Sequence, residues 1–86
     1  MKSQNEFPYS PRVELNRDML VFESAYMLWQ HSMHGGNDGW IVPAGTIVTI
    51  VEFLGRKGFN GTTIRLQNGQ FAVTRFDAKL DHPRKV

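Results

Sequence analysis

The Asn68-Gly69 pair constrains the fold of this 86-residue chain more than any other feature, because it lies between two segments that alternate apolar and polar residues. A type I′ hairpin turn needs positive φ at both central residues, and Asn-Gly meets that need. Counting outward from such a turn pairs Gln67 with Gln70, Leu66 with Phe71, Arg65 with Ala72, Ile64 with Val73 and Thr63 with Thr74. This register predicts a hairpin whose buried face is formed by Leu66, Phe71, Ile64 and Val73, with the polar residues on the other face.

The segments on either side of this hairpin predict further barrel elements. Residues 46–54 are rich in β-branched side chains and follow a turn at Pro43-Ala44-Gly45, so we expect a strand long enough to bend between two sheets. Residues 55–61 are rich in glycine and predict a loop. After the hairpin, Asp77-Ala78-Lys79-Leu80 suits a short helical turn that tucks Leu80 into the barrel.

Residues 16–34 fit two structures. Polar residues recur there in pairs six to seven positions apart, which predicts an amphipathic helix with Asn16 as N-cap and Gly35-Gly36 as its stop. The same segment is rich in aromatic and branched residues that suit a long first strand. Residues 1–15, with Pro8 and Pro11, are expected to form an irregular arm.

The turn at Pro43-Ala44-Gly45-Thr46, the β-branched strand, the Gly-rich loop, the Asn68-Gly69 hairpin and the closing turn at residues 77–80 together resemble bacterial SH3-like or KOW-type small barrels. The resemblance covers residues 40–82. It implies a mostly β fold, a small SH3-like barrel preceded by an N-terminal amphipathic helix or a long first strand. It also implies a module that binds RNA, DNA or protein. Residues 83–86 would follow as a basic tail, and residues 1–86 would form one domain.

The composition excludes several classes of protein. Without cysteine there is no disulfide framework, no thiolate nucleophile and no Cys-based metal centre, which favours a cytoplasmic protein. No apolar run approaches the roughly 20 residues that span a bilayer, so we expect no membrane association. A core this small leaves homo-oligomerisation open.

The charge distribution indicates an anionic partner. Residues 1–54 carry three basic and six acidic side chains, whereas residues 55–86 carry seven basic and two acidic ones. We expect a nucleic-acid-binding strip on the basic half, in which cations contact phosphates and an aromatic ring stacks on a base. The residues assigned to this strip are Arg56, Lys57, Phe59, Arg65 and Arg75.

Aromatic residues before the barrel support an alternative, a protein-interaction module or inhibitor, such as an accessory factor of a phage or mobile element. Tyr26, Trp29 and Trp40 would then form an exposed contact surface. His31 and His34 share a helix face but supply only two metal ligands, so no metal or other cofactor is expected. The serines lie in no nucleophile elbow, and the sequence therefore predicts a protein that is not an enzyme.

Overall fold

The computed structural model describes residues 11–36, 38–56, 59–77 and 79–86, and for residues 54–60 it describes no side chains. The described chain forms one helix and seven strands. In chain order these are β1 (Arg12–Glu14), β2 (Met19–Phe22), α2 (Ala25–His34), β3 (Trp40–Val42), β4 (Ile47–Arg56), β5 (Phe59–Arg65), β6 (Phe71–Thr74) and β7 (Arg84–Lys85).

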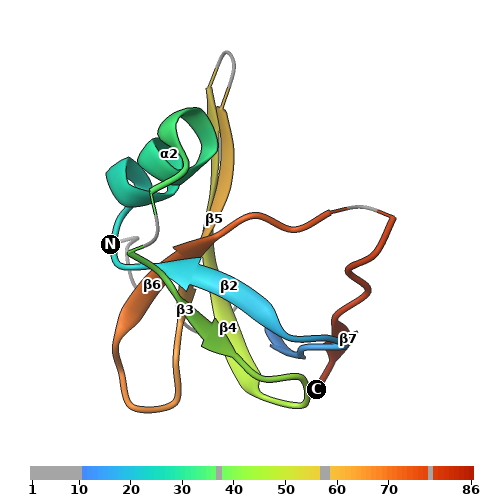
Figure 1. The fold of residues 1–86 in the computed structure, drawn as a ribbon. Coiled ribbons are helices and arrows are strands. Elements are labelled where there is room, and N and C mark those ends of the chain that lie inside the picture. Colours follow the sequence, from blue (N-terminus) through green and yellow to red (C-terminus); the bar gives the residue numbers. More distant parts are fainter. Residues whose placement is uncertain (1–10, 37, 57–58, 78) are drawn as a thin grey trace.

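The seven strands make one antiparallel sheet in the order β3-β2-β6-β5-β4-β1-β7. The sheet curls into a half-barrel, with β2 and β3 crossing in front of the long β4–β5 hairpin (Figure 1). The register of β4 shifts between Ile50 and Glu52, and such a bulge lets a long strand bend. The prediction of a mostly β, barrel-like fold is confirmed.

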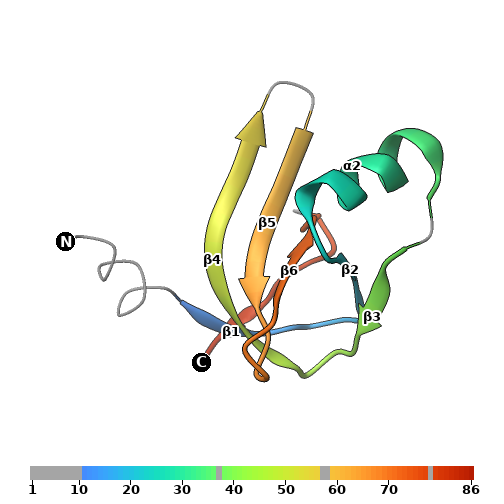
Figure 2. The same ribbon diagram turned by 90° about the vertical axis from the view of Figure 1, so that its left-hand side faces the viewer.

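Two apolar clusters lie on opposite faces of this sheet. The larger cluster fills the inside of the curl, where Val21, Val48, Ile64 and Ala72 are almost fully buried. Side chains alternate along a strand, so Phe22 and Val73 point to the outer face, and Leu28 of α2 packs on them there. Figures 1 and 2 show α2 lying over the part of the sheet where β2 pairs with β6. The helix is therefore attached to the outside of the curl.

Residues 16–34 contain a strand and a helix, so the predictions of one continuous helix or one long strand are both wrong in extent. The helix begins at Ser24, whose hydroxyl accepts a hydrogen bond from the Met27 N–H, and Asn16 is not its N-cap. It ends as predicted at Gly35, which has φ 74° and donates to the His31 carbonyl. The aromatic residues that suited both structures are divided between β2 and α2.

Two segments, one near each end of the described chain, are more regular than predicted. Residues 12–14, assigned to the irregular arm, pair with β4, and the Val13 side chain joins the core. Arg84 and Lys85, assigned to the basic tail, form β7 and pair with β1. These pairings join residues far apart in sequence, and so neither segment shows a local pattern.

The β5–β6 hairpin has a register one residue away from the predicted one. The pairs are Thr62 with Thr74, Thr63 with Val73, Ile64 with Ala72 and Arg65 with Phe71. The loop has three residues, because the Gly69 N–H bonds the Leu66 carbonyl and the Leu66 N–H bonds the Gln70 carbonyl. Gly69 has φ 90° while Asn68 does not adopt positive φ, which is the bulged loop type instead of type I′.

This register corrects the predicted buried face. Ala72 is fully buried beside Ile64, whereas Phe71 is 49% exposed and lies on the outer face with Arg65. Val73 is buried on that outer face, where it packs with Phe22 of β2 and Leu28 of α2. The two faces of β6 are thus covered by different parts of the molecule, and Phe71 lies in neither apolar cluster.

The turn before β7 forms as predicted but does not bury the predicted residue. The Leu80 and Asp81 N–H groups donate to the Asp77 carbonyl, yet Leu80 is 56% exposed. Asp81 is the buried member, and its carboxylate accepts two hydrogen bonds from Arg17. A polar clamp therefore holds this turn where an apolar contact was expected.

Candidate functional site

Four side chains form a row across the outer face of the sheet. Arg12 of β1 pairs with Thr49 of β4, Thr49 pairs with Arg65 of β5, and Arg65 pairs with Phe71 of β6. Paired residues of antiparallel strands project to the same face, and their inward neighbours are core residues. We call these four residues the arginine row.

The arginine row places two cations and an aromatic ring side by side. Adjacent strands lie about 4.8 Å apart, so the backbones of Arg12 and Arg65 are separated by about 10 Å and that of Phe71 is one strand further. Arg12 and Phe71 are exposed, and Thr49 and Arg65 are half-buried. A cavity of about 300 Å³ extends from Arg12 and Thr49 past Arg65 to the hairpin loop at Gln67.

An ion pair borders the arginine row. Arg84 of β7 lies opposite Glu14 of β1, and its guanidinium donates to the Glu14 carboxylate at 2.5 Å. This hydrogen bond, with the charge of Glu14, raises the pKa of Arg84 above its ordinary value. Because Arg84 neutralises Glu14, the carboxylate next to the row does not cancel the charges of Arg12 and Arg65.

The structure describes the side chains of only two of the five residues predicted for the basic strip, Arg65 and Arg75, and they lie apart. Arg65 belongs to the arginine row, whereas Arg75 follows the other end of β6 and lines a different cavity. Arg56 pairs with Phe59 at the far end of the β4–β5 hairpin, but the side chains of both lie outside the described residues, as does Lys57. Sequence reasoning missed Arg12, since its segment of three paired residues is too short to show alternation.

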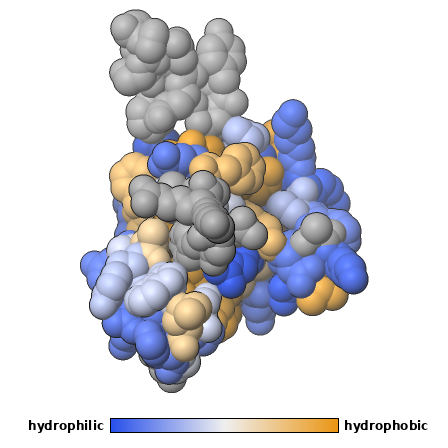
Figure 3. All heavy atoms as spheres, turned by 90° about the horizontal axis from the view of Figure 1, so that it is seen from above, coloured by the Kyte–Doolittle hydropathy of each residue, from blue (hydrophilic) through white to orange (hydrophobic). Residues whose placement is uncertain are grey.

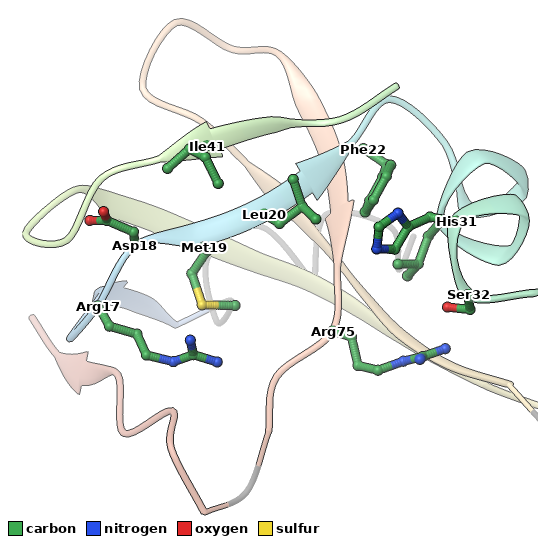
Figure 4. A pocket seen from close by; sticks show the side chains of 10 residues that line it. Arg17, Asp18, Met19, Leu20, Phe22, His31, Ser32, Ile41 and Arg75 are labelled. Carbon is green, nitrogen blue, oxygen red and sulfur yellow. The ribbon is translucent and has the colours of Figure 1, made fainter. Parts of the chain in front are cut away.

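The second cavity, of about 370 Å³, lies where α2 meets the outer face of β2 and β3 (Figure 4). We call it the helix groove. Leu20 and Ile41, paired across β2 and β3, form one wall, and Leu28, His31 and Ser32 of α2 form the other. Arg75 lies at the α2 end, and Arg17 and Asp18 lie at the opposite end.

Hydrogen bonds hold both ends of the helix groove. At the α2 end the His31 ring packs on Phe22 with centroids 5.1 Å apart, and its Nδ1 donates to the Gly36 carbonyl. At the other end the Asp18 carboxylate accepts from the Ala44 N–H. The groove walls are therefore positioned by contacts within the protein itself.

The Arg17–Asp81 pair anchors the Arg17 end of the groove. Burial raises the pKa of Asp81, but the hydrogen bonds from Arg17 and from the Asp77 N–H, with the charges of Arg17 and His82, outweigh burial and leave the pKa lowered. The hydrogen bond to Asp81 in turn raises the pKa of Arg17. Asn16 strengthens the clamp, because its side chain bonds both the Leu80 carbonyl and the His82 N–H.

The three aromatic residues predicted to form one protein-contact surface do not lie together. Tyr26 and Trp29 lie exposed on α2 with ring centroids 6.0 Å apart, and exposed Met33 extends the same helix face. Trp40 is partly buried against the larger core cluster, so it does not belong to this surface. Figure 3 shows hydrophobic residues on one side of the molecule in separate groups with hydrophilic residues between them.

The histidines considered as metal ligands have other contacts. His31 packs on Phe22, and the His34 and Trp29 rings form a T-shaped pair with centroids 5.5 Å apart. Among the described residues no group of three or more His, Asp or Glu side chains is arranged to hold a metal ion. Of the serines, Ser24 caps α2 and Ser32 lines the helix groove.

Comparison with known proteins finds no relative of this chain: no family model, no curated protein and no solved structure matches it. Within the described ranges no helix combines the length and the apolar character that a membrane crossing needs. Function must therefore be argued from the two surfaces described above.

Proposed function

We propose that this protein is a non-catalytic, SH3-like small-barrel module that binds single-stranded nucleic acid through the arginine row. The single observation that carries the proposal is the register, which sets Arg12, Thr49, Arg65 and Phe71 side by side on one solvent-facing surface. The elements that carry the SH3-like resemblance support it at the level of fold. These are the turn before β4, the long bulged β4, the β5–β6 hairpin and the turn before β7.

The chemistry of the row suits unpaired bases. Guanidinium groups bind phosphates with several N–H donors, and this contact is independent of sequence. An exposed aromatic ring offers a stacking surface to any base that is not already stacked in a duplex. Phe71 lies beside Arg65 on the row, so one strand can place a base on the ring and its phosphates over the cations.

Fluorescence anisotropy titrations with labelled single-stranded RNA, single-stranded DNA and duplex, each over a series of salt concentrations, test the proposal. We expect the single strands to bind more tightly than the duplex, with affinity falling as salt rises. Each of Arg12→Gln and Arg65→Gln should reduce the slope of log K against log salt by about 0.7, the contribution of one phosphate contact on a single strand. Phe71→Leu should weaken binding by about 1 to 3 kcal/mol and leave the slope unchanged.

Lys79→Gln is the matched control, because it removes the same charge from the exposed turn before β7. An equal loss in Lys79→Gln and Arg65→Gln would mean that net charge alone attracts nucleic acid, and the row would lose its role. Absence of binding at low salt would overturn the proposal. That result would favour the alternative of a protein partner on the exposed α2 face, which Trp29→Ala tests.

A further inference from the structure

The helix groove has a composition that the arginine row lacks. Its facing walls are apolar: Leu20 and Ile41 belong to β2 and β3, and Leu28 belongs to α2. The end that carries Ser32 and Arg75, called the α2 end above, is polar. Ligand cavities in proteins typically have this combination of apolar lining and a few polar groups that orient the ligand. The groove therefore fits a ligand that is itself divided into an apolar part and a polar part.

The charges of the groove differ between its two ends. Arg17 is occupied by two hydrogen bonds to Asp81, and Asp18 adds a carboxylate at the same end. The α2 end carries the guanidinium of Arg75 and the exposed Ser32 hydroxyl, and Figure 4 shows both on the side away from Asp18. An anionic group is thus attracted to the α2 end and repelled from the Asp18 end.

The size of the groove limits what can occupy it. A volume of about 370 Å³ is at the small end of the range for ligand pockets, so it suits a small molecule and is too small for a folded domain. Arginine binds a carboxylate with two parallel hydrogen bonds, and the Ser32 hydroxyl on the same side of the groove supplies a further donor.

We propose that the helix groove binds a small amphipathic carboxylate, with its carboxyl group on Arg75 and Ser32 and its apolar body between Leu20, Ile41 and Leu28. This site is separate from the arginine row and does not depend on nucleic-acid binding. Binding would lock α2 to the sheet, because the ligand contacts the helix and both β2 and β3.

Titration of the ¹⁵N-labelled full chain with sodium octanoate, followed by amide chemical shifts, tests the site. 1-Octanol has the same alkyl chain without the charge, so it tests the contribution of the carboxylate. Phenyl phosphate tests whether the anion that the groove prefers is a phosphate. We expect octanoate to shift amides around Leu20, Ser32 and Ile41 in the wild type and to bind more tightly than octanol. Arg75→Gln should weaken octanoate at least about tenfold and leave octanol unchanged, as expected for the loss of a charged hydrogen bond.

Ile41→Glu is a second, independent variant, because residue 41 is 55% exposed and a carboxylate there repels the ligand without disturbing the core. Arg65→Gln is the control that removes an equal charge from the arginine row. Equal affinity for octanoate and octanol, unchanged octanoate binding in both groove variants, or shifts confined to the arginine row would each overturn the proposal. Stronger binding of phenyl phosphate than of octanoate would contradict the assignment of a carboxylate.

Discussion

The arginine row and the helix groove lie on the same outer face of the sheet, yet they differ in what covers them. At the row the face is open, and Arg12, Thr49, Arg65 and Phe71 meet solvent side by side. At the groove α2 covers the face and encloses apolar walls. The helix therefore makes part of the open outer face into a concave groove with apolar walls.

This difference determines how strongly ligand binding at each surface depends on salt concentration. Binding to the row rests on exposed cations, and ions in solution screen such charges over about 10 Å. Binding in the groove rests on apolar contact with one charged group at its end, so salt should affect it less. A single face can thus hold two sites with different ligands. Substitutions in α2 should change binding at the groove and leave binding at the row as it is.

The largest expected effect comes from Leu28→Ala, which removes the buried side chain that fixes α2 to the sheet. Truncation of a buried leucine costs about 2 to 4 kcal/mol in the free energy of unfolding. Groove binding of octanoate should be lost, while the row's affinity for single-stranded RNA should stay within about twofold at temperatures where the variant is folded. Urea unfolding and the two titrations measure these quantities.

Met33→Ala is the matched control, because Met33 lies on the same helix and is 61% exposed. Its stability should remain within about 0.5 kcal/mol of the wild type. If Leu28→Ala weakened both ligands equally, the two surfaces would not be independent, and the comparison between them would fail.

Gly39→Ala should have the next largest effect. A Cβ at residue 39 would lie 2.5 Å from the Val21 carbonyl oxygen and 2.8 Å from the Phe22 ring, and the backbone must shift to admit it. We expect a loss of about 2 kcal/mol in the free energy of unfolding, together with weaker octanoate binding, since Phe22 lines the groove.

Gly36→Ala tests whether this loss comes from the close approach. Its added Cβ would meet its nearest atom at 4.0 Å, an ordinary contact. A neutral or slightly stabilising effect is expected, because alanine restricts the unfolded chain more than glycine does. Similar losses at both glycines would contradict the proposed cause.

Local patterns were sufficient to predict those parts of the fold that local forces determine. The turn at Pro43-Ala44-Gly45, most of β4 and the end of α2 at Gly35 all follow from short-range chemistry. The hairpin register was not predictable in this way, because Asn-Gly suits a two-residue turn and also a three-residue loop. Asn68 accepts a hydrogen bond from the Gln70 N–H in the loop that forms, and one residue of difference moves Phe71 to the outer face.

The candidate sites depend still more on contacts distant in sequence. Arg65 was recognised as a cation on a hairpin face, but its partner Arg12 is brought to it only through β4. The helix groove needs α2, β2 and β3 together, and the sequence left residues 16–34 undivided. Arg75 was assigned to a strip with Arg65, although the two line different cavities.

A smaller effect is expected at the clamp that closes the Arg17 end of the groove. The pKa of Asp81 is lowered by folding, so its carboxylate stabilises the fold fully above its ordinary value of 3.8. This contribution is lost as the pH falls from there through the lower pKa of the folded protein. Because Arg17 is partly exposed and solvent screens the pair, we expect a contribution of about 1 to 2 kcal/mol.

Urea unfolding of the wild type and Asp81→Asn at a series of pH values measures this contribution. The variant should be less stable near neutral pH and should lose less stability between about pH 4 and pH 2. A parallel acid dependence in both proteins would show that Asp81 does not contribute. RNA binding should not change, because neither Asp81 nor Arg17 belongs to the arginine row.

The smallest effect is expected at the ion pair beside the arginine row. Arg84 is largely exposed, so Glu14→Gln should leave the free energy of unfolding almost unchanged. It should nevertheless raise the row's affinity for single-stranded RNA about twofold to threefold at low salt, because Arg84 then loses the carboxylate that neutralises it and adds a cation beside Arg12. Glu23→Gln removes the same charge between β2 and α2 and is the control. A gain in affinity confined to Glu14→Gln, with octanoate binding unchanged, would place the RNA at the row. Equal gains in both variants would mean that RNA responds to net charge alone, and the row would not be its site.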